Sequence, residues 1–310
     1  MVYLSVFLPY DLAICTVFVI TFVGTSLSYH SYLWPDEFPP LFLNLPPWLP
    51  SKSDLERLER SWVDPVTRPP KDMSYHLYET KARGIETFGS YLVSLPPGAR
   101  QGSIAVQVYR RAMEQGDMPK AIIVSPQALP VGWYVNSKDG QRPVEDVIIN
   151  DLIPHIDTNF HTISSKFGRG IEGFSMGGYG ALHLGFKYPE IFGGISAVAP
   201  SIMMSLEDEP LERTYNTFEE DSFYYYANGP WALSSMNQMA LQNGTSIRIL
   251  SGADDDRLTQ CIDQLVDHLH HLGIKSDSFE TKGAGHDFPK ILAGLEESAF
   301  SYWRDALKGV

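Results

Sequence analysis

The chain has few cysteines and fewer positive than negative charges, and each shortage argues against certain structures or partners. Its 310 residues include only two cysteines, Cys15 and Cys261, which is too few for a disulfide framework. Lysine and arginine together number 24 against 37 aspartates and glutamates, giving a formal net charge of −13. This balance argues against nucleic acid or an anionic membrane surface as a partner.

Several motifs that would indicate a bound cofactor, and any sign of a repeat architecture, are also absent from the sequence. The sequence has no phosphate-binding P-loop, no dinucleotide-binding fingerprint and no H-E-x-x-H zinc motif. No internal repeat is present, which excludes a solenoid or a propeller. The length instead suits one large α/β domain with an extension.

Residues 1–30 form an apolar N-terminal segment. Leu12–Gly24 carries no charge, but it is too short for a membrane-spanning helix. A secretory signal has a basic start, whereas the first basic residue here is Lys52. Two expectations stay open: secretion or membrane anchoring if residues 1–28 act as a signal, and otherwise a cytoplasmic protein with an N-terminal extension or a buried strand.

Beyond this segment, a proline-rich arm over residues 31–61 precedes an α/β domain over residues 62–310. Strand-like and helical patterns alternate in that domain, which predicts a mostly parallel sheet with helices on both faces. We expect the first two strands to be joined by a polar turn. The predicted strands are 75–80, 89–95, 121–124, 170–172, 193–198, 247–250 and 276–281. The predicted helices are 103–115, 146–156, 181–186, 258–272 and 288–307.

A G-x-S-x-G motif lies between a predicted strand and a predicted helix, in the run Gly173-Phe-Ser-Met-Gly-Gly-Tyr-Gly180. In this setting the motif is typical of the nucleophile elbow of serine hydrolases, where the serine occupies a strained turn between strand and helix. The glycines on either side of Ser175 remove side chains that would collide. We therefore expect Ser175 to be the nucleophile and the Met176 N–H to face an oxyanion.

A serine nucleophile needs a base and an orienting acid, which follow it in the order acid, then histidine, in α/β-hydrolases. His286 follows the strand predicted at 276–281. Three adjacent aspartates, Asp254, Asp255 and Asp256, follow the strand predicted at 247–250. Both loops lie just past the carboxyl ends of strands, where ligands bind in such sheets. Spacing alone leaves the choice of acid open.

The motifs G-F-S-M-G-G-Y-G-A, G-A-D-D-D and G-A-G-H-D-F together resemble the esterase family of α/β-hydrolases over about residues 62–308. That family includes S-formylglutathione hydrolase (esterase D), feruloyl and acetylxylan esterases and the mycolyltransferases. Its G-x-x-D pattern maps onto Gly252–Asp255, which implies Asp255 as the acid and Asp256 as the alternative. The resemblance implies cleavage of carboxylic esters or thioesters through an acyl-enzyme, without a cofactor, and a small-molecule or carbohydrate-linked ester as the substrate.

One departure from the family is large. Relatives follow the L-P-P-G stretch with a mid-sheet strand and a His-Gly loop that donates a second oxyanion N–H. Here Leu95-Pro-Pro-Gly98 runs almost directly into the helix predicted at 103–115, and the chain has no His-Gly pair. The sequence therefore predicts a missing strand beside the nucleophile strand, as in a truncated gene product. One hypothesis is that Cys15–Gly24 fills the vacancy.

Aromatic residues supply candidates for the substrate pocket. Trp133, Tyr134 and Trp231 either shape an acyl or alcohol pocket or pack a long insertion. The predicted activity is a serine carboxylic-ester hydrolase. The alternatives are a catalytically impaired hydrolase-fold protein that binds without turnover, and an acyltransferase.

Overall fold

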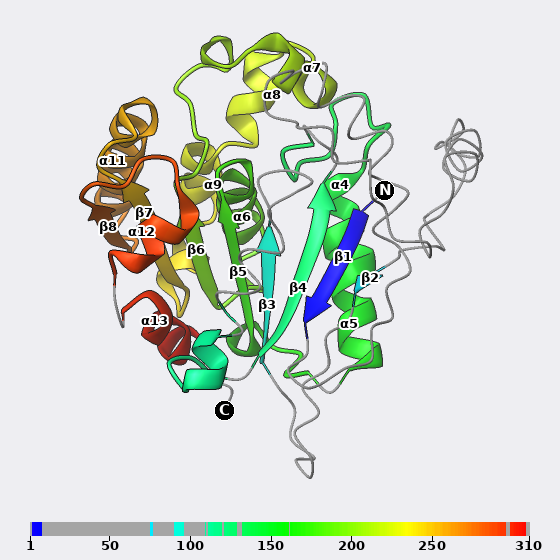
Figure 1. The fold of residues 1–310 in the computed structure, drawn as a ribbon. Helices are drawn as coiled ribbons and strands as arrows, with labels where there is room; N and C mark the ends of the chain where they lie inside the picture. The colour runs from blue at the N-terminus through cyan, green and yellow to red at the C-terminus, as the bar shows by residue number, and fades with distance from the viewer. Residues whose placement is uncertain are drawn as a thin grey trace, which may run out of the picture.

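The computed structural model describes residues 2–7, 75–76, 90–95, 109, 111–119, 121–128, 132–160, 162–295 and 298–307. Within these residues an eight-stranded sheet has the order β2-β1-β4-β3-β5-β6-β7-β8 and is flanked by helices (Figure 1). Strands β3 to β8 run parallel to one another, whereas β1 runs antiparallel to β4. The predicted α/β-hydrolase architecture is confirmed.

The strands are β1 (Val2–Phe7), β2 (Tyr75–His76), β3 (Ser90–Leu95), β4 (Ala121–Ala128), β5 (Arg169–Phe174), β6 (Gly194–Val198), β7 (Ser246–Gly252) and β8 (Asp277–Thr281). The helices of the sheet layers are α4 (Val144–Asp146), α5 (Ile153–Asn159), α6 (Met176–Lys187), α11 (Asp256–His271), α12 (Phe288–Ala293) and α13 (Ser298–Ala306). A π-helical turn, Val147–Leu152, joins α4 to α5.

The central strands are buried along their whole length, as expected where helices cover both faces of a parallel sheet. Every residue of β5 and β6 is buried. Helix α11 is apolar along one face only, and its Leu258, Ile262, Leu265 and Leu269 are buried in the core. These layers fix the carboxyl ends of the strands, from which the loops with chemistry-bearing residues emerge.

The predicted vacancy beside the nucleophile strand is wrong. Strand β3 pairs in parallel with β5 on one side, from Tyr91 opposite Arg169 to Leu95 opposite Gly173, and with β4 on the other. The strand predicted at 89–95 thus occupies the mid-sheet position. With β3 in that position, both β4 and β5 have a pairing partner in the centre of the sheet, where unpaired backbone groups would be costly.

The N-terminal segment supplies the strand between β2 and β4. Val2–Phe7 forms β1, which pairs antiparallel with β4 and parallel with β2. The strands predicted at 75–80 and 89–95 are not neighbours in the sheet, because β1 and β4 separate β2 from β3. The turn predicted between them lies outside the described residues. The run Cys15–Gly24 and the arm at 31–61 lie outside the described residues. Among the helices that the structure describes, none has the length and apolar character to cross a membrane.

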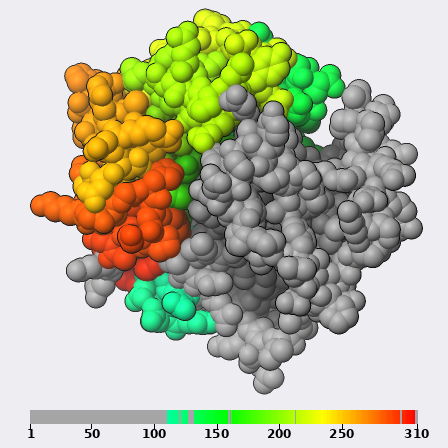
Figure 2. Space-filling view, turned by 45° about the horizontal axis from the view of Figure 1, so that its top comes forward, coloured from blue at the N-terminus to red at the C-terminus, as the bar shows by residue number. Residues whose placement is uncertain are grey.

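Between β6 and β7 the chain forms an insertion of short helices: α7 (Leu211–Phe218), α8 (Ser222–Ala227), α9 (Pro230–Met236) and α10 (Gln238–Gln242). Figure 2 shows this insertion, in yellow-green, beside the orange C-terminal segments. An ion pair of 2.7 Å between Arg257 on α11 and Glu209 ties the two together. The helix predicted at 288–307 is divided, since α12 ends before Gly294 and α13 begins at Ser298.

Candidate active site

Ser175 lies at the sharp turn between β5 and α6. Its backbone has φ 59° and ψ −120°, a conformation that L-residues rarely adopt. Gly173 permits the turn, because a Cβ atom there would lie 1.9 Å from the Gly177 carbonyl oxygen. Although Ser175 occupies the N-cap of α6, its hydroxyl makes no cap hydrogen bond. The oxygen is thus held at the carboxyl end of the sheet and is available to other side chains.

Met176 is the first residue of α6. N–H groups in the first turn of a helix have no acceptor within the helix and lie at the positive end of its dipole. The N–H next to Ser175 is therefore a donor suited to negative charge that develops beside the Ser175 hydroxyl.

His286 lies in the loop between β8 and α12 and makes hydrogen bonds in two directions. Its Nε2 lies 2.8 Å from Ser175 Oγ, and its Nδ1 lies 2.7 Å from Asp255 Oδ2. The ring packs against Phe174, with 4.7 Å between the ring centroids. Since a carboxylate accepts, Nδ1 carries the proton and Nε2 is left to accept from the serine hydroxyl.

Asp255 is placed by the start of helix α11. It occupies the N-cap of that helix, yet its side chain makes no cap hydrogen bond and contacts His286 instead. Its neighbours Asp254 and Asp256 are exposed, and Asp256 already belongs to α11. The structure therefore brings Asp255, of the three aspartates, to the histidine.

The acid loop and the histidine loop touch through Gly252, the last residue of β7. A Cβ atom at Gly252 would lie 2.3 Å from the Ala284 oxygen and 2.4 Å from the Gly285 oxygen. Asp254 N donates to Ala284 O across the same contact, at 2.9 Å. This close approach of two backbones allows Asp255 and His286 to meet.

The three aromatic pocket candidates pack within the protein. Trp133 and Tyr134 are 3% and 1% exposed, and both have positive φ angles, of 50° and 60°. The Trp133 indole N–H donates to the Arg213 carbonyl of α7 at 2.7 Å, and its ring packs edge-on against Tyr179. Trp231 lies on α9, partly buried against the core. Trp133 packs against the insertion, whereas the Tyr134 side chain lies against Gly180 of α6. Contact of the three aromatic residues with a substrate stays a prediction.

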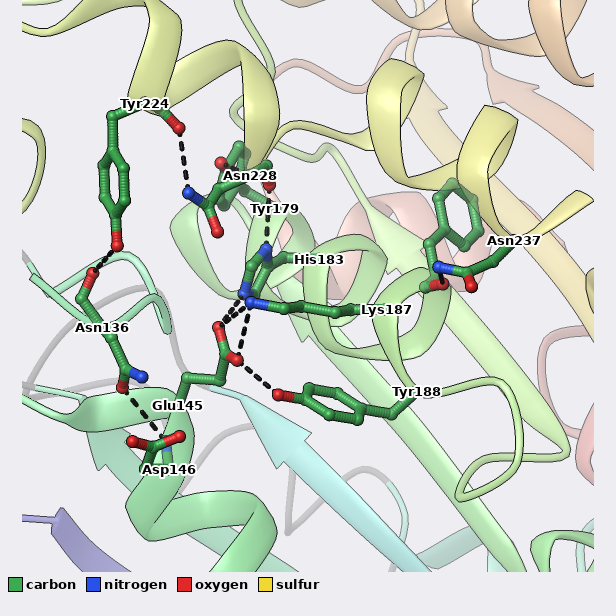
Figure 3. Close-up of polar contacts among 11 residues, drawn as sticks. Asn136, Glu145, Asp146, Tyr179, His183, Lys187, Tyr188, Tyr224, Asn228 and Asn237 are labelled. Atoms are coloured by element: carbon green, nitrogen blue, oxygen red, sulfur yellow. Dashed lines mark hydrogen bonds and ion pairs between the residues drawn. The ribbon is translucent and has the colours of Figure 1, made fainter. Parts of the chain in front are cut away.

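A buried polar cluster braces helix α6 behind the elbow (Figure 3). His183 on α6 contacts Glu145 Oε2 through Nε2 at 2.6 Å and the Asn228 carbonyl through Nδ1 at 2.8 Å. Lys187 and Tyr188 also donate to Glu145. Burial opposes ionisation of Glu145, but these hydrogen bonds and the charge of His183 lower its pKa to about 2.

One further side chain contacts the nucleophile candidate. Ser201, in the loop after β6, places its Oγ 3.2 Å from Ser175 Oγ and is 4% exposed. Ser201 was not among the residues predicted from the sequence, although its position just past the carboxyl end of a strand was a usable signal. Among the residues that the structure describes, no group of three or more histidines, cysteines, aspartates or glutamates is arranged to hold a metal ion.

Comparison with known proteins places this α/β-hydrolase in a family. The family model described as "Putative esterase" matches residues 99–307, so the chain belongs to the esterase family. Esterase Rv1288 of Mycobacterium tuberculosis strain H37Rv is 43% identical over 79 residues, which are 24% of this chain and 17% of that protein. An endo-1,4-β-xylanase/feruloyl esterase of Xylanibacter ruminicola is 26% identical over 161 residues, covering 52% of this chain and 18% of the relative. The matches thus span less than a fifth of these curated relatives.

Solved structures share the fold at low sequence identity. A ferulic acid esterase superposes with a TM-score of 0.58 at 18% identity, covering 70% of this chain and 85% of that one. An S-formylglutathione hydrolase of Staphylococcus aureus gives a TM-score of 0.56 at 14% identity, with coverage of 72% and 87%. Both likenesses support the α/β-hydrolase architecture.

Proposed function

We propose that the protein is a serine carboxylic-ester hydrolase that works through an acyl-enzyme, with Ser175 as nucleophile, His286 as general base and acid, and Asp255 as the orienting carboxylate. The observation that carries this proposal is the continuous chain of hydrogen bonds from Asp255 through His286 to Ser175, at 2.7 and 2.8 Å. Membership of the esterase family supports the same reaction.

In this mechanism Ser175 Oγ attacks the ester carbonyl carbon while its proton passes to His286 Nε2. Asp255 holds the Nδ1 proton and stabilises the imidazolium that forms. The tetrahedral oxygen accepts a hydrogen bond from the Met176 N–H, and His286 then protonates the departing alcohol. Water activated by His286 hydrolyses the acyl-enzyme in the second half of the reaction.

The substrate is an ester with a small-molecule or carbohydrate-linked alcohol, as the family membership suggests. His286 is 35% exposed at its side chain, so the reacting groups lie close to solvent. An acyl group on Ser175 is therefore within reach of water, which favours hydrolysis. Transfer to another alcohol needs only that this alcohol replace water at the same position.

Hydrolysis of short-chain p-nitrophenyl esters by the purified protein, with a fluorophosphonate probe in parallel, tests the proposal. We expect turnover and labelling in the wild type and neither in Ser175→Ala, with the same melting temperature for both proteins. Serine-to-alanine replacement at Ser235, an exposed residue on α9, is the matched control and should leave both unchanged. Unlabelled wild type with a cooperative melt would instead favour a binding role.

A further inference from the structure

We propose that Ser201 is a catalytic residue that donates a hydrogen bond to the Ser175 oxygen. This bond stabilises negative charge on Ser175 Oγ when the serine gives up its proton in acylation and when Oγ departs from the acyl carbon in deacylation. This inference rests on the proposed function. Ser201 Oγ is 3.2 Å from Ser175 Oγ and buried beside it.

The direction of this hydrogen bond follows from counting protons. Ser175 has one hydroxyl proton, and His286 Nε2 accepts it because Nδ1 donates to Asp255. The Ser175 oxygen can then only accept from Ser201. A donor aimed at the nucleophile is poorly placed to compete for His286, so it leaves the proton path through His286 intact.

Backbone hydrogen bonds fix Ser201 against the elbow. Ser201 N donates to Ser175 O at 2.9 Å, and Ser175 N donates to Val198 O at 2.9 Å. Ala199, between them in the chain, has φ 40°, a left-handed conformation that an alanine adopts only where its surroundings hold it. Two strained residues, Ser175 and Ala199, thus bring the two hydroxyls together.

The insertion anchors the far side of the same loop. The Tyr225 hydroxyl on α8 accepts from Met203 N and donates to Met203 O, each at 3.1 Å. Tyr225 itself is buried. The backbone of the Ser201 loop is therefore held both by the elbow and by the insertion, which keeps the Cα atom of Ser201 beside Ser175.

The contact acts in both halves of the reaction. During acylation the Ser175 proton goes to His286, and the Ser201 hydrogen bond strengthens as the oxygen gains negative charge. During deacylation water gives a proton to His286 and its oxygen bonds to the acyl carbon. The bond between that carbon and Ser175 Oγ then breaks, its electron pair stays on Ser175 Oγ, and His286 passes the proton to that oxygen. Ser201 keeps its own proton throughout, so water is the only further reactant.

The test is burst kinetics with p-nitrophenyl acetate, which separates acylation from deacylation. Because a hydrogen bond to a partly charged oxygen is lost, Ser201→Ala should slow each step about tenfold and leave the melting temperature unchanged. The matched control is Ser205→Ala, in the same loop, where the serine only caps a short 3₁₀ helix and should leave the rates as they are. Wild-type rates in Ser201→Ala would overturn the inference.

Ser201→Cys is the second variant, for the case in which Ser201→Ala does not melt cooperatively. It keeps the shape of the side chain and a weaker donor, so both steps should run between the wild-type and alanine rates. Wild-type rates in a folded Ser201→Cys would overturn the inference. Failure of the proposed function gives a different result. Either the Ser175→Ala variant still hydrolyses the ester, or the wild type does not, and each of these results overturns both the proposed function and the role of Ser201.

Discussion

Glu145 and His183 form a buried pair that joins the helical turn before the elbow strand to the helix after it. Their side chains are 3% and 0% exposed, and 2.6 Å separates Glu145 Oε2 from His183 Nε2. The other ring nitrogen contacts the Asn228 carbonyl, so both nitrogens face acceptors and the contacts are satisfied only when both carry protons. Tyr179, on the same helix, donates to the same carbonyl at 3.0 Å. This cluster fixes α6, and with it Ser175, against the insertion.

We expect Glu145→Gln to destabilise the protein strongly, because it leaves the donors of His183, Lys187 and Tyr188 without a charged acceptor. Breaking a buried ion pair by removing one partner typically costs about 3–5 kcal/mol. Urea unfolding at pH 7 measures the loss. Asp146→Asn is the matched control one residue along, exposed to solvent, and should change the free energy of unfolding by less than about 0.5 kcal/mol. Equal stability of the two variants would contradict this role of Glu145.

The same carboxylate gives the protein a dependence on acid. Its pKa is lowered from the ordinary glutamate value of 4.5 to about 2 in the folded protein. The unfolded chain therefore binds its proton first as the pH falls, and the stabilisation from ionised Glu145 is complete above pH 4.5 and lost as the pH falls towards 2. The gap in unfolding free energy between wild type and Glu145→Gln should narrow over that interval. A gap that stays constant down to about pH 2 would refute the argument.

Adjacent aspartates allow a direct test of the acid. Asp255→Asn should lower kcat for p-nitrophenyl acetate by about 10³–10⁴-fold, because the amide favours the wrong tautomer of His286. Asp256→Asn changes an exposed neighbour that starts α11 and should leave kcat within a few-fold of the wild type. The reverse ranking of the two variants would assign the role to Asp256.

Gly252 offers a geometric test of how the two loops meet. An alanine there would place its Cβ atom 2.3 Å from the Ala284 oxygen, so the histidine loop must move away from the acid loop. We expect Gly252→Ala to lower both the melting temperature and kcat. The control is Gly285→Ala, where the nearest atom to the added Cβ is the Asp254 oxygen at 3.8 Å, an ordinary contact. Similar losses in both variants would show that loop glycines matter for another reason.

The sequence predicted those helices and strands whose formation depends on the local hydrophobic pattern. The buried strand before Ser175, the helix after it and the amphipathic helix at 258–272 all follow from hydrophobic periodicity, and the structure has β5, α6 and α11 in those places. The juxtaposition of Ser175 and His286 followed from a different rule, that such loops share one edge of the sheet.

The order of the first strands was not readable in the same way. Strand-like patterns at residues 75–80 and 89–95 do not say which neighbour each will find, because pairing depends on contacts between distant parts of the chain. In the structure β3 lies between β4 and β5, and Val2–Phe7 pairs with the other edge of β4. Ser201 was missed because a lone serine in a loop has no periodicity, and its position past the end of a strand is a signal that it shares with many other loop residues.

Glu172 on β5 makes the opposite pH prediction to Glu145. It is 1% exposed, with Arg248 Nη2 at 4.0 Å and the Ser196 hydroxyl at 3.4 Å from its Oε1. Burial disfavours its charged form, and although Arg248 and Ser196 offset part of that effect, its pKa is raised to about 7. The folded protein therefore holds this proton more tightly than the unfolded chain does.

A raised pKa contributes stability below the unfolded value of 4.5, and that contribution is lost as the pH rises through about 7. Glu172→Gln carries no such proton, so the difference in unfolding free energy between the variant and the wild type should shift in favour of the variant as the pH rises from 4.5 to about 7, by about 3 kcal/mol in all. Arg248 also donates to the Ser196 hydroxyl and the Ala299 carbonyl, and we expect both bonds to persist in this variant. Glu280→Gln, on an exposed position of β8, controls for the chemistry of the substitution and should show no such trend. If the unfolding free energy of Glu172→Gln instead falls relative to that of the wild type as the pH rises, Glu172 is ionised in the folded protein and its attraction to Arg248 outweighs the cost of its burial.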